Sequence, residues 1–255
     1  MTVPATTLAD VFAQHQHERP DAPLLLAPET GRQHTYGALG ADVAALDALL
    51  TAQGIGAGAH VGFLLPNGLA TSALFLATMI AGRVTVPLNL LSQAPQLAYV
   101  LAHSEVRCVF VSGEQAATLA AAVALLPTTA GATPGIAVVN IDVDVPLASQ
   151  LPPRTNARAS AAPQANDPAL LMYTSGTTGK PKGALLTHAN LLHAARTVAA
   201  WHRLTPADRV LSSLPLYHIN GQCIATLSPF VSGGSIVTPH RFSASAWWGW
   251  VDAWQ

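Results

Sequence analysis

The chain has 255 residues, of which 50% are hydrophobic and only 10% are charged, and its formal net charge is −1. A nearly neutral chain without a basic run does not match the charge of a nucleic-acid backbone, so we expect no nucleic-acid partner. The length is sufficient for one large hydrophobic core or two smaller ones.

The cysteines and the apolar segments predict a cytoplasmic protein that does not span a membrane. Cys108 and Cys223 form neither a metal-spaced pair nor a disulfide framework, which suits a reducing compartment. Residues 1–12 lack the positive charge and apolar segment of a signal peptide. The uncharged stretch 61–82 is interrupted by Pro66-Asn67-Gly68, which leaves a helix shorter than the roughly 20 residues that span a bilayer.

Helical and strand patterns alternate through the first half of the chain. The predicted helices are residues 41–52, 69–81, 94–104 and 116–126, and the predicted strands are residues 60–65, 84–88, 107–112 and 135–141. This rhythm predicts an α/β fold with doubly wound, mostly parallel sheets and helices on both faces.

The alternation stops at residues 147–168, which are rich in Pro, Ala, Ser and Asn and predict an exposed connection. The elements expected beyond it are a buried strand at 169–173, a helix at 189–201 capped by Thr187, a strand near 209–213, a helix after Gly221 and a strand after Gly234. A last helix begins near Ser243, and the chain stops within its periodic run at Gln255. We therefore expect the chain to be a piece of a longer protein.

The segment 174–183 (TSGTTGKPKG) combines three glycines, four hydroxyls and two lysines directly after a buried strand. Backbone N–H groups of such a turn can bind anionic oxygens, and the lysines add positive charge, so a polyphosphate is the expected ligand. The common Gly-x4-Gly-Lys-Ser/Thr loop does not match, because Pro181 follows Lys180. Residues 54–58 (GIGAG) follow a helix and precede a strand, which predicts a helix C-cap and turn rather than a dinucleotide site.

Residues 173–183 resemble the phosphate-loop signature of the AMP-forming adenylating enzymes, a superfamily that includes acyl-CoA synthetases, amino-acid adenylation domains and beetle luciferases. Three further segments resemble elements of that family in the expected order: residues 33–39 (QHTYGAL), 77–89 (ATMIAGRVTVPLN) and 214–221 (LPLYHING). A polar surface loop is the alternative interpretation of the glycine-rich segment, but few such loops carry this order behind a buried strand. The resemblance covers nearly the whole chain, from about residue 8 to residue 255.

The resemblance implies roles for individual residues. The residues that would bind the β- and γ-phosphates of ATP are Thr174, Ser175, Gly176, Thr177, Thr178, Gly179, Lys180 and Lys182. Thr174 would also help to hold Mg²⁺. Lys182 and His218 would be catalytic, with His218 beside the acyl carboxylate and the transferred phosphate; a structural histidine packed under the loop is the alternative for His218. The other histidines show no metal spacing, and we expect His15 and His17 at the surface.

The resemblance also implies a domain organisation. Residues 1–255 would form an incomplete N-terminal AMP-binding domain, with a central α/β subdomain at 55–205 and the start of a second sheet subdomain at 206–255. A magnesium-binding Glu, a ribose-binding Asp and the C-terminal lid domain with its catalytic Lys would lie beyond Gln255. We therefore expect the 255-residue chain alone to be inactive.

The implied reaction of the full enzyme converts a carboxylic acid, ATP and CoA into an acyl-CoA, AMP and pyrophosphate. Residues 217–223 look closest to bacterial CoA ligases for small or medium acids, including the carnitine and crotonobetaine type. Three alternatives stay open: an adenylating enzyme that loads a carrier protein, a non-catalytic nucleotide-binding module, and a split enzyme completed by a second polypeptide. The expected protein partner is a second copy of the chain or the missing C-terminal half.

Overall fold

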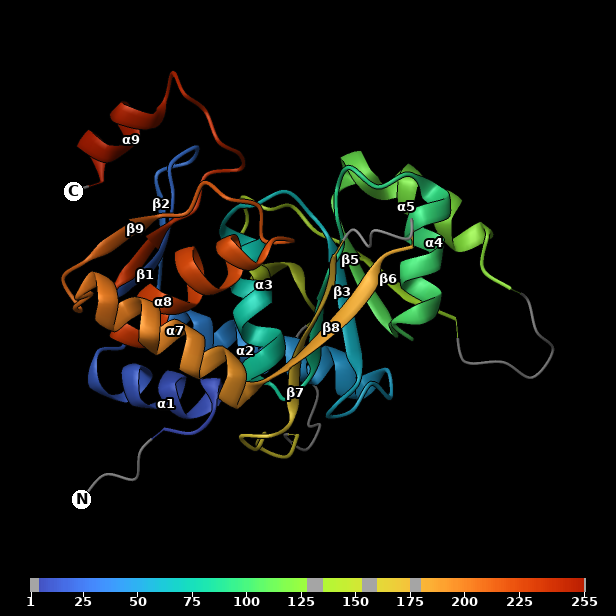
Figure 1. The fold of residues 1–255 in the computed structure, drawn as a ribbon, viewed down its shortest axis with the longest axis horizontal. Coiled ribbons are helices and arrows are strands. Elements are labelled where there is room, and N and C mark those ends of the chain that lie inside the picture. Colours follow the sequence, from blue (N-terminus) through green and yellow to red (C-terminus); the bar gives the residue numbers. More distant parts are fainter. Residues whose placement is uncertain (1–4, 128–134, 153–159, 175–179, 255) are drawn as a thin grey trace.

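The computed structural model describes residues 5–127, 135–152, 160–174 and 180–254. Two β-sheets lie side by side in it, with helices between and around them (Figure 1). The six-stranded sheet contains β3 (His60–Leu64), β4 (Val84–Pro87), β5 (Cys108–Val111), β6 (Ala137–Asn140), β7 (Pro168–Thr174) and β8 (Lys182–Thr187). Its order is β6-β5-β3-β4-β7-β8, and every neighbouring pair is parallel except β7–β8. The predicted doubly wound, mostly parallel α/β arrangement is confirmed.

The four-stranded sheet joins the two ends of the chain. It contains β1 (Pro23–Ala27), β2 (Arg32–Thr35), β9 (Arg209–Leu211) and β10 (Ser235–Val237), in the order β2-β1-β10-β9. Residues 206–255 therefore supply only two of its strands, and residues 23–35, for which the sequence predicted no strand, supply the other two. The subdomain boundary at residue 205 stays a prediction.

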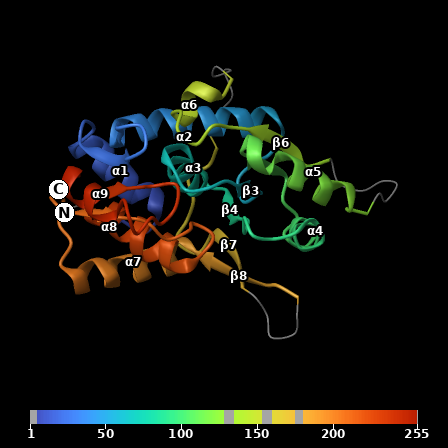
Figure 2. The same cartoon turned by 90° about the horizontal axis from the view of Figure 1, so that it is seen from above.

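Helices cover both faces of the six-stranded sheet (Figure 2). The helices of the chain are α1 (Leu8–Glu18), α2 (Tyr36–Ala52), α3 (Leu69–Ile80), α4 (Ala94–His103), the 3-10 helix η1 (Gly113–Gln115), α5 (Ala116–Ala124), α6 (Leu147–Gln150), α7 (His188–His202), the π-helix η2 (Asn220–Leu227), α8 (Ser228–Ser232) and α9 (Trp247–Ala253). Leu97 and Leu119 of α4 and α5 share one hydrophobic cluster with Val86 and Val109 of the sheet. A second, larger cluster fills the space between the two sheets.

α3 is the central layer between the sheets. It contacts both β1 and β4, and every residue from Leu69 to Ile80 is buried. Its hydroxyls are satisfied inside the protein: Thr71 Oγ1 donates to Pro66 O at 2.6 Å, and Ser72 Oγ lies 2.9 Å from Thr238 Oγ1 just after β10. The uncharged stretch that contains α3 is thus a core helix. No helix among the described residues is long and apolar enough to cross a membrane.

A buried arginine just after α3 binds α2 and the segment that follows α2. Arg83 is fully buried, and its guanidinium binds the carboxylate of Asp47 on α2 and donates to Ile55 O at 3.1 Å. Asp47 also accepts a hydrogen bond of 2.7 Å from Ser160 Oγ. The pKa of Asp47 is lowered: burial raises it, and the hydrogen bonds from Ser160 and Arg83 outweigh that effect. The carboxylate therefore stays charged beside Arg83.

Several local predictions need correction. The helix predicted at 41–52 begins at Tyr36, because the Thr35 hydroxyl caps it by accepting a hydrogen bond of 3.1 Å from Ala38 N. His15 was expected at the surface but is buried, whereas His17 is exposed as predicted. His15 packs against Tyr36 with ring centroids 5.3 Å apart, so the interior face of an unpredicted helix, α1, explains the error.

The stretch 147–168 is less exposed than its composition predicted. Its start forms the short helix α6, and Leu147 and Leu151 are buried in the core between the sheets. The helix expected after Gly221 begins at Asn220 and has the wider π-helical turn. A last helix is present as α9, but it begins at Trp247 with Ala246 as its N-cap residue, not near Ser243. Ser243 Oγ accepts a hydrogen bond of 3.3 Å from Ala246 N in the turn before the helix.

Candidate active site

The predicted phosphate segment connects the antiparallel strands β7 and β8. Thr174 ends β7 and is paired directly with Lys182, the first residue of β8, and Tyr173 is paired with Gly183. Side chains of directly opposed residues in an antiparallel pair lie on the same face, with Cβ atoms about 5 Å apart. The exposed side chains of Thr174 and Lys182 are therefore neighbours. Of the other predicted phosphate ligands, Lys180 is described and exposed, and residues 175–179 lie outside the described residues.

The two faces of β7 have different neighbours. Leu171 and Tyr173 pack with the α4–α5 cluster, whereas Leu170 and Met172 belong to the core between the sheets. Because side chains alternate along a strand, Thr174 lies on the face of Leu170 and Met172. The Thr174–Lys182 pair thus lies on the side of the sheet that faces the second sheet.

Gly183 lies close to its neighbours within this hairpin. A Cβ atom at this position would lie 3.1 Å from Leu171 Cδ1, a tight contact, and 3.5 Å from ring atoms of Tyr173, an ordinary one. An alanine here would require the end of the Leu171 side chain to shift by a few tenths of an ångström.

His218 lies in a short segment between β9 and η2. Its side chain is exposed, and its ring packs against Tyr217 with centroids 4.6 Å apart. Its backbone is fixed, since His218 N donates to Pro215 O at 3.0 Å and Gln222 N donates to His218 O at 3.1 Å. Within the described part of the chain the imidazole has no hydrogen-bond partner. The alternative of a histidine packed under the loop does not fit this exposure.

Asn67 connects the His218 segment to the six-stranded sheet. This buried residue follows β3; its Nδ2 donates to Leu214 O at 2.8 Å and its Oδ1 accepts from Leu216 N at 3.0 Å. Leu216 is part of the core between the sheets. Because β3 and β7 flank β4, their carboxyl ends are separated by roughly 10 Å. The structure thus brings Thr174, Lys182 and the His218 segment to the same edge and the same face of the sheet.

The π-helix after His218 depends on a second glycine. A Cβ atom at Gly221 would lie 2.4 Å from Pro215 O and 2.9 Å from Leu214 O, so only glycine permits this close approach. π-helical turns are rare and occur often at functional sites. Gln222 of this turn donates from Nε2 to Leu216 O at 2.7 Å and holds the segment from the other side.

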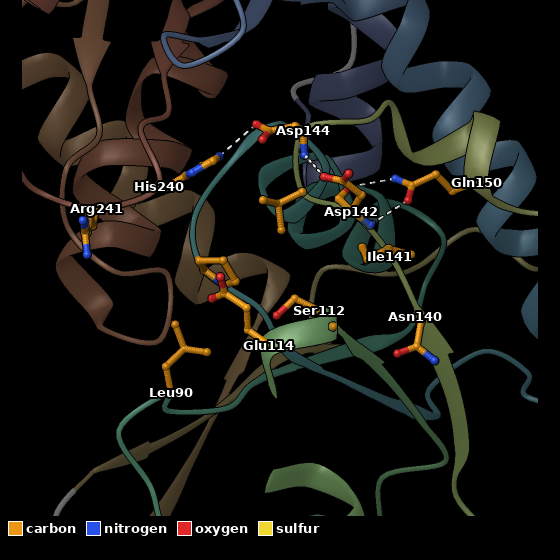
Figure 3. A pocket seen from close by; sticks show the side chains of 13 residues that line it. Leu90, Ser112, Glu114, Asn140, Ile141, Asp142, Asp144, Gln150, His240 and Arg241 are labelled. Atoms are coloured by element: carbon orange, nitrogen blue, oxygen red, sulfur yellow. Dashed lines mark hydrogen bonds and ion pairs between the residues drawn. The ribbon is translucent and has the colours of Figure 1, made fainter. Parts of the chain in front are cut away.

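A separate cavity of about 940 Å³ lies at the same edge, beyond β3, β5 and β6 (Figure 3). Its titratable lining residues are Glu114, Asp142, Asp144, His240 and Arg241. His240 Nε2 and Asp144 Oδ1 lie 2.8 Å apart and share a hydrogen bond. Three carboxylates disfavour a triphosphate, so the hairpin remains the better phosphate site.

The comparison with known proteins decides the family. A model of the AMP-binding enzyme family matches residues 12–255. The chain belongs to this family. Sequence reasoning pointed to the hairpin segment and to His218 as site residues, which stay predictions. It did not point to Asn67, whose Pro66-Asn67-Gly68 context indicated only a helix boundary.

The curated relatives of the chain include CoA ligases. It is 47% identical over 246 residues to the sulfoacetate–CoA ligase of Cupriavidus necator, an alignment that covers 95% of this chain and 47% of the relative. It is 33% identical over 223 residues to the medium/long-chain-fatty-acid–CoA ligase FadD6 of Mycobacterium tuberculosis, covering 87% of this chain and 36% of the relative. The chain spans about half the length, or less, of these relatives.

Solved structures show the same fold. ATP-bound MatB from Rhodopseudomonas palustris superposes with a TM-score of 0.80 at 27% identity, covering 96% of this chain and 48% of that one. The inhibitor-bound N-terminal domain of FACL13 from Mycobacterium tuberculosis gives 0.79 at 26% identity, covering 96% of this chain and 60% of that one. These likenesses confirm the expected N-terminal portion of an adenylating enzyme.

Proposed function

We propose that this chain is the ATP-binding half of an AMP-forming acid–CoA ligase. The observation that carries the proposal is the arrangement at one sheet edge: the Thr174–Lys182 pair and the exposed His218 lie on one face. Adenylation requires positive charge and hydrogen-bond donors at the phosphates and at the attacking carboxylate. The arrangement supplies both kinds of group.

Each described residue has a distinct part in this proposal. Lys182 places a mobile positive charge beside the mouth of the hairpin, where it would neutralise the triphosphate as pyrophosphate departs. Thr174 and Lys180 would donate hydrogen bonds to the same phosphates, together with residues 175–179. His218 would orient the acyl carboxylate by donating a hydrogen bond to it.

Mg²⁺ and CoA are part of the proposed reaction. No group of three or more histidine, cysteine or carboxylate side chains in the described ranges could hold a metal ion. Mg²⁺ keeps several waters and binds mainly through substrate phosphates with one or two protein ligands. The exposed Thr174 hydroxyl fits such a single supporting ligand. The ion would neutralise phosphate charge when it is bound.

The proposed substrate is a small carboxylic acid, and the first candidate is sulfoacetate. The 47% identity to the sulfoacetate–CoA ligase supports this choice. The buried, free thiols of Cys108 and Cys223 suit a reducing compartment, so we place the protein in the cytoplasm. Assembly as a homodimer, or with a separate C-terminal half, stays a proposal.

ATP–pyrophosphate exchange tests the proposed reaction. A polypeptide that extends this chain by the half present in its relatives should exchange label in the presence of sulfoacetate at about 1 per second or faster. The 255-residue chain alone should bind ATP but show negligible exchange. Exchange by the short chain at the rate of the long one would contradict the half-enzyme assignment, and no exchange by the long chain with any acid would contradict the reaction. Supplying CoA or a phosphopantetheinyl carrier protein then identifies the thiol acceptor.

A further inference from the structure

The exposed side of α4 carries two stacked rings beside the phosphate hairpin. Tyr99 and His103 are four residues apart, which places them on the same side of the helix. Their ring centroids are 5.6 Å apart with an interplanar angle of 30°. The beginning of β8 lies on the side of α4 in both views of the fold (Figures 1 and 2). This pair of rings is therefore available to the hairpin.

Tyr173, the last residue but one of β7, is bound to this pair. Its hydroxyl lies 2.8 Å from His103 Nδ1, and the two rings meet edge to face at 5.7 Å and 81°. On its other side the ring lies over Gly183, where a Cβ atom would come within 3.5 Å of it. Burial raises the pKa of Tyr173 to about 12, so its hydroxyl stays protonated at neutral pH and can donate to the imidazole.

Lys180 is bound to the same pair from the other end of the phosphate segment. Its Nζ lies 5.9 Å from the centroid of the Tyr99 ring, within the range of a cation–π interaction. Tyr173 precedes residues 175–179 and Lys180 follows them. The helix α4 therefore contacts the chain both before residues 175–179, at Tyr173, and after them, at Lys180.

We propose that Tyr99 and His103 of α4 are positioning residues for ATP binding, because they hold Tyr173 and Lys180 at the two ends of the phosphate segment. This inference rests on the proposed function. It gives Lys180 a second role beside its hydrogen bonds to the phosphates, as an anchor on Tyr99. Lys182, paired with Thr174 on the opposite face of the hairpin, remains the lysine that neutralises the departing pyrophosphate. Holding Tyr173 and Lys180 in place before a nucleotide arrives lowers the cost of ordering these two residues on binding.

The test measures the affinity of the intact protein for a non-hydrolysable ATP analogue with Mg²⁺ by calorimetry. His103→Ala and Tyr173→Phe should each weaken binding by about threefold to tenfold, the effect of one lost hydrogen bond. The double variant should be no weaker than the weaker single variant, because both changes remove the same interaction. His103→Asn, whose amide can replace Nδ1, should restore binding to within about twofold. His193→Ala, which removes an exposed histidine from α7, is the matched control.

Trypsin provides a readout that does not depend on nucleotide. The bond after Lys180 resists trypsin because Pro181 follows it, so cleavage after Lys182 reports on the hairpin. Cleavage should be at least about threefold faster in His103→Ala and Tyr173→Phe than in the wild type and in His193→Ala, with an unchanged urea midpoint. Wild-type protein that fails to bind ATP would overturn the proposed function. Wild-type protein that binds ATP, with variants that match it in affinity and cleavage, would overturn the positioning role alone.

Discussion

Asn67 Oδ1 accepts a hydrogen bond of 3.0 Å from the backbone of Leu216, across a long separation in sequence. Asn67 Nδ2 donates to Leu214 O at 2.8 Å, so one side chain binds two backbone groups of the segment before His218. Asn67→Ala should lower the free energy of unfolding by about 1–3 kcal/mol, because it leaves a buried N–H unsatisfied. Urea denaturation measures this change.

The control for Asn67 is Asn89→Ala, since Asn89 is exposed and its Oδ1 binds only the nearby Leu91 N. That variant should stay within about 0.5 kcal/mol of the wild type. Equal effects of the two substitutions would show that the bridge to Leu216 contributes nothing specific.

The two lysines of the hairpin should respond differently to truncation. In the extended polypeptide, Lys182→Ala should reduce transition-state stabilisation by about 2–4 kcal/mol, the effect of one lost preorganised electrostatic contact. Lys180→Ala should mainly weaken ATP binding. Both side chains are exposed, so folding should be unaffected. The measurement is kcat/KM for ATP. If this value for Lys182→Ala lies within about twofold of wild type while Lys180→Ala is inactive, the roles assigned to Lys180 and Lys182 must be exchanged.

Two buried histidines should make the protein less stable in mild acid. Burial lowers the pKa of His188 below its usual value, although Asp167 and Asp10 oppose this shift. Such a group binds its proton more readily in the unfolded chain, so stability present at neutral pH is lost as the pH falls below about 6.5. His188 Nδ1 also accepts a hydrogen bond of 3.3 Å from Leu8 N, which a protonated ring could not do.

Urea midpoints between pH 7.5 and pH 5 check this pH dependence. His188→Asn keeps an acceptor at the Nδ1 position but does not titrate, so its midpoint should fall less with pH than that of the wild type. Burial, with repulsion from Arg19, also lowers the pKa of His15, although Val231 O and Glu18 oppose this shift. His15 should therefore cause the pH dependence that remains in the His188→Asn variant. His17→Asn, at an exposed position, should leave the slope unchanged.

The ion pair between Arg83 and Asp47 should be costly to break from one side. Asp47→Ala leaves the fully buried guanidinium without its carboxylate and should destabilise the protein by about 3–5 kcal/mol. Replacing both partners by apolar residues, Arg83→Met with Asp47→Leu, should cost less than Asp47→Ala. Thermal unfolding compares the double variant with Asp47→Ala. A double variant less stable than Asp47→Ala would show that the unpaired guanidinium is not the source of the cost.

The elements that the sequence predicted share a local signal. α3 and the strands β3 to β6 are apolar runs bounded by glycine, proline or polar residues. β2 (RQHT) lacked that signal because its residues are polar, whereas β1 (PLLLA) is an apolar run that was not recognised as a strand. The partner of β1 is β10, near the other end of the chain, so its pairing depends on topology and not on local pattern.

The same division applies to the candidate site. The order of residues 173–183 indicated a phosphate segment, because its composition and the preceding strand are local features. The contacts that support it are not local: His103 lies 70 residues before Tyr173, and Asn67 lies 149 residues before Leu216. Nothing in the chemistry of an exposed histidine on a helix specifies a distant tyrosine. Such support becomes visible only when the strand order is known.

The burial of α3 from all sides determines how the chain can unfold. A helix that contacts β1 on one side and β4 on the other cannot lose either sheet without exposing an apolar surface along its whole length. The two sheets therefore form one cooperative unit, and a segment containing only the six-stranded sheet would not be an autonomous folding domain. Any change that loosens the N-terminal hairpin β1–β2 would be transmitted to the proposed nucleotide-binding edge through this shared helix.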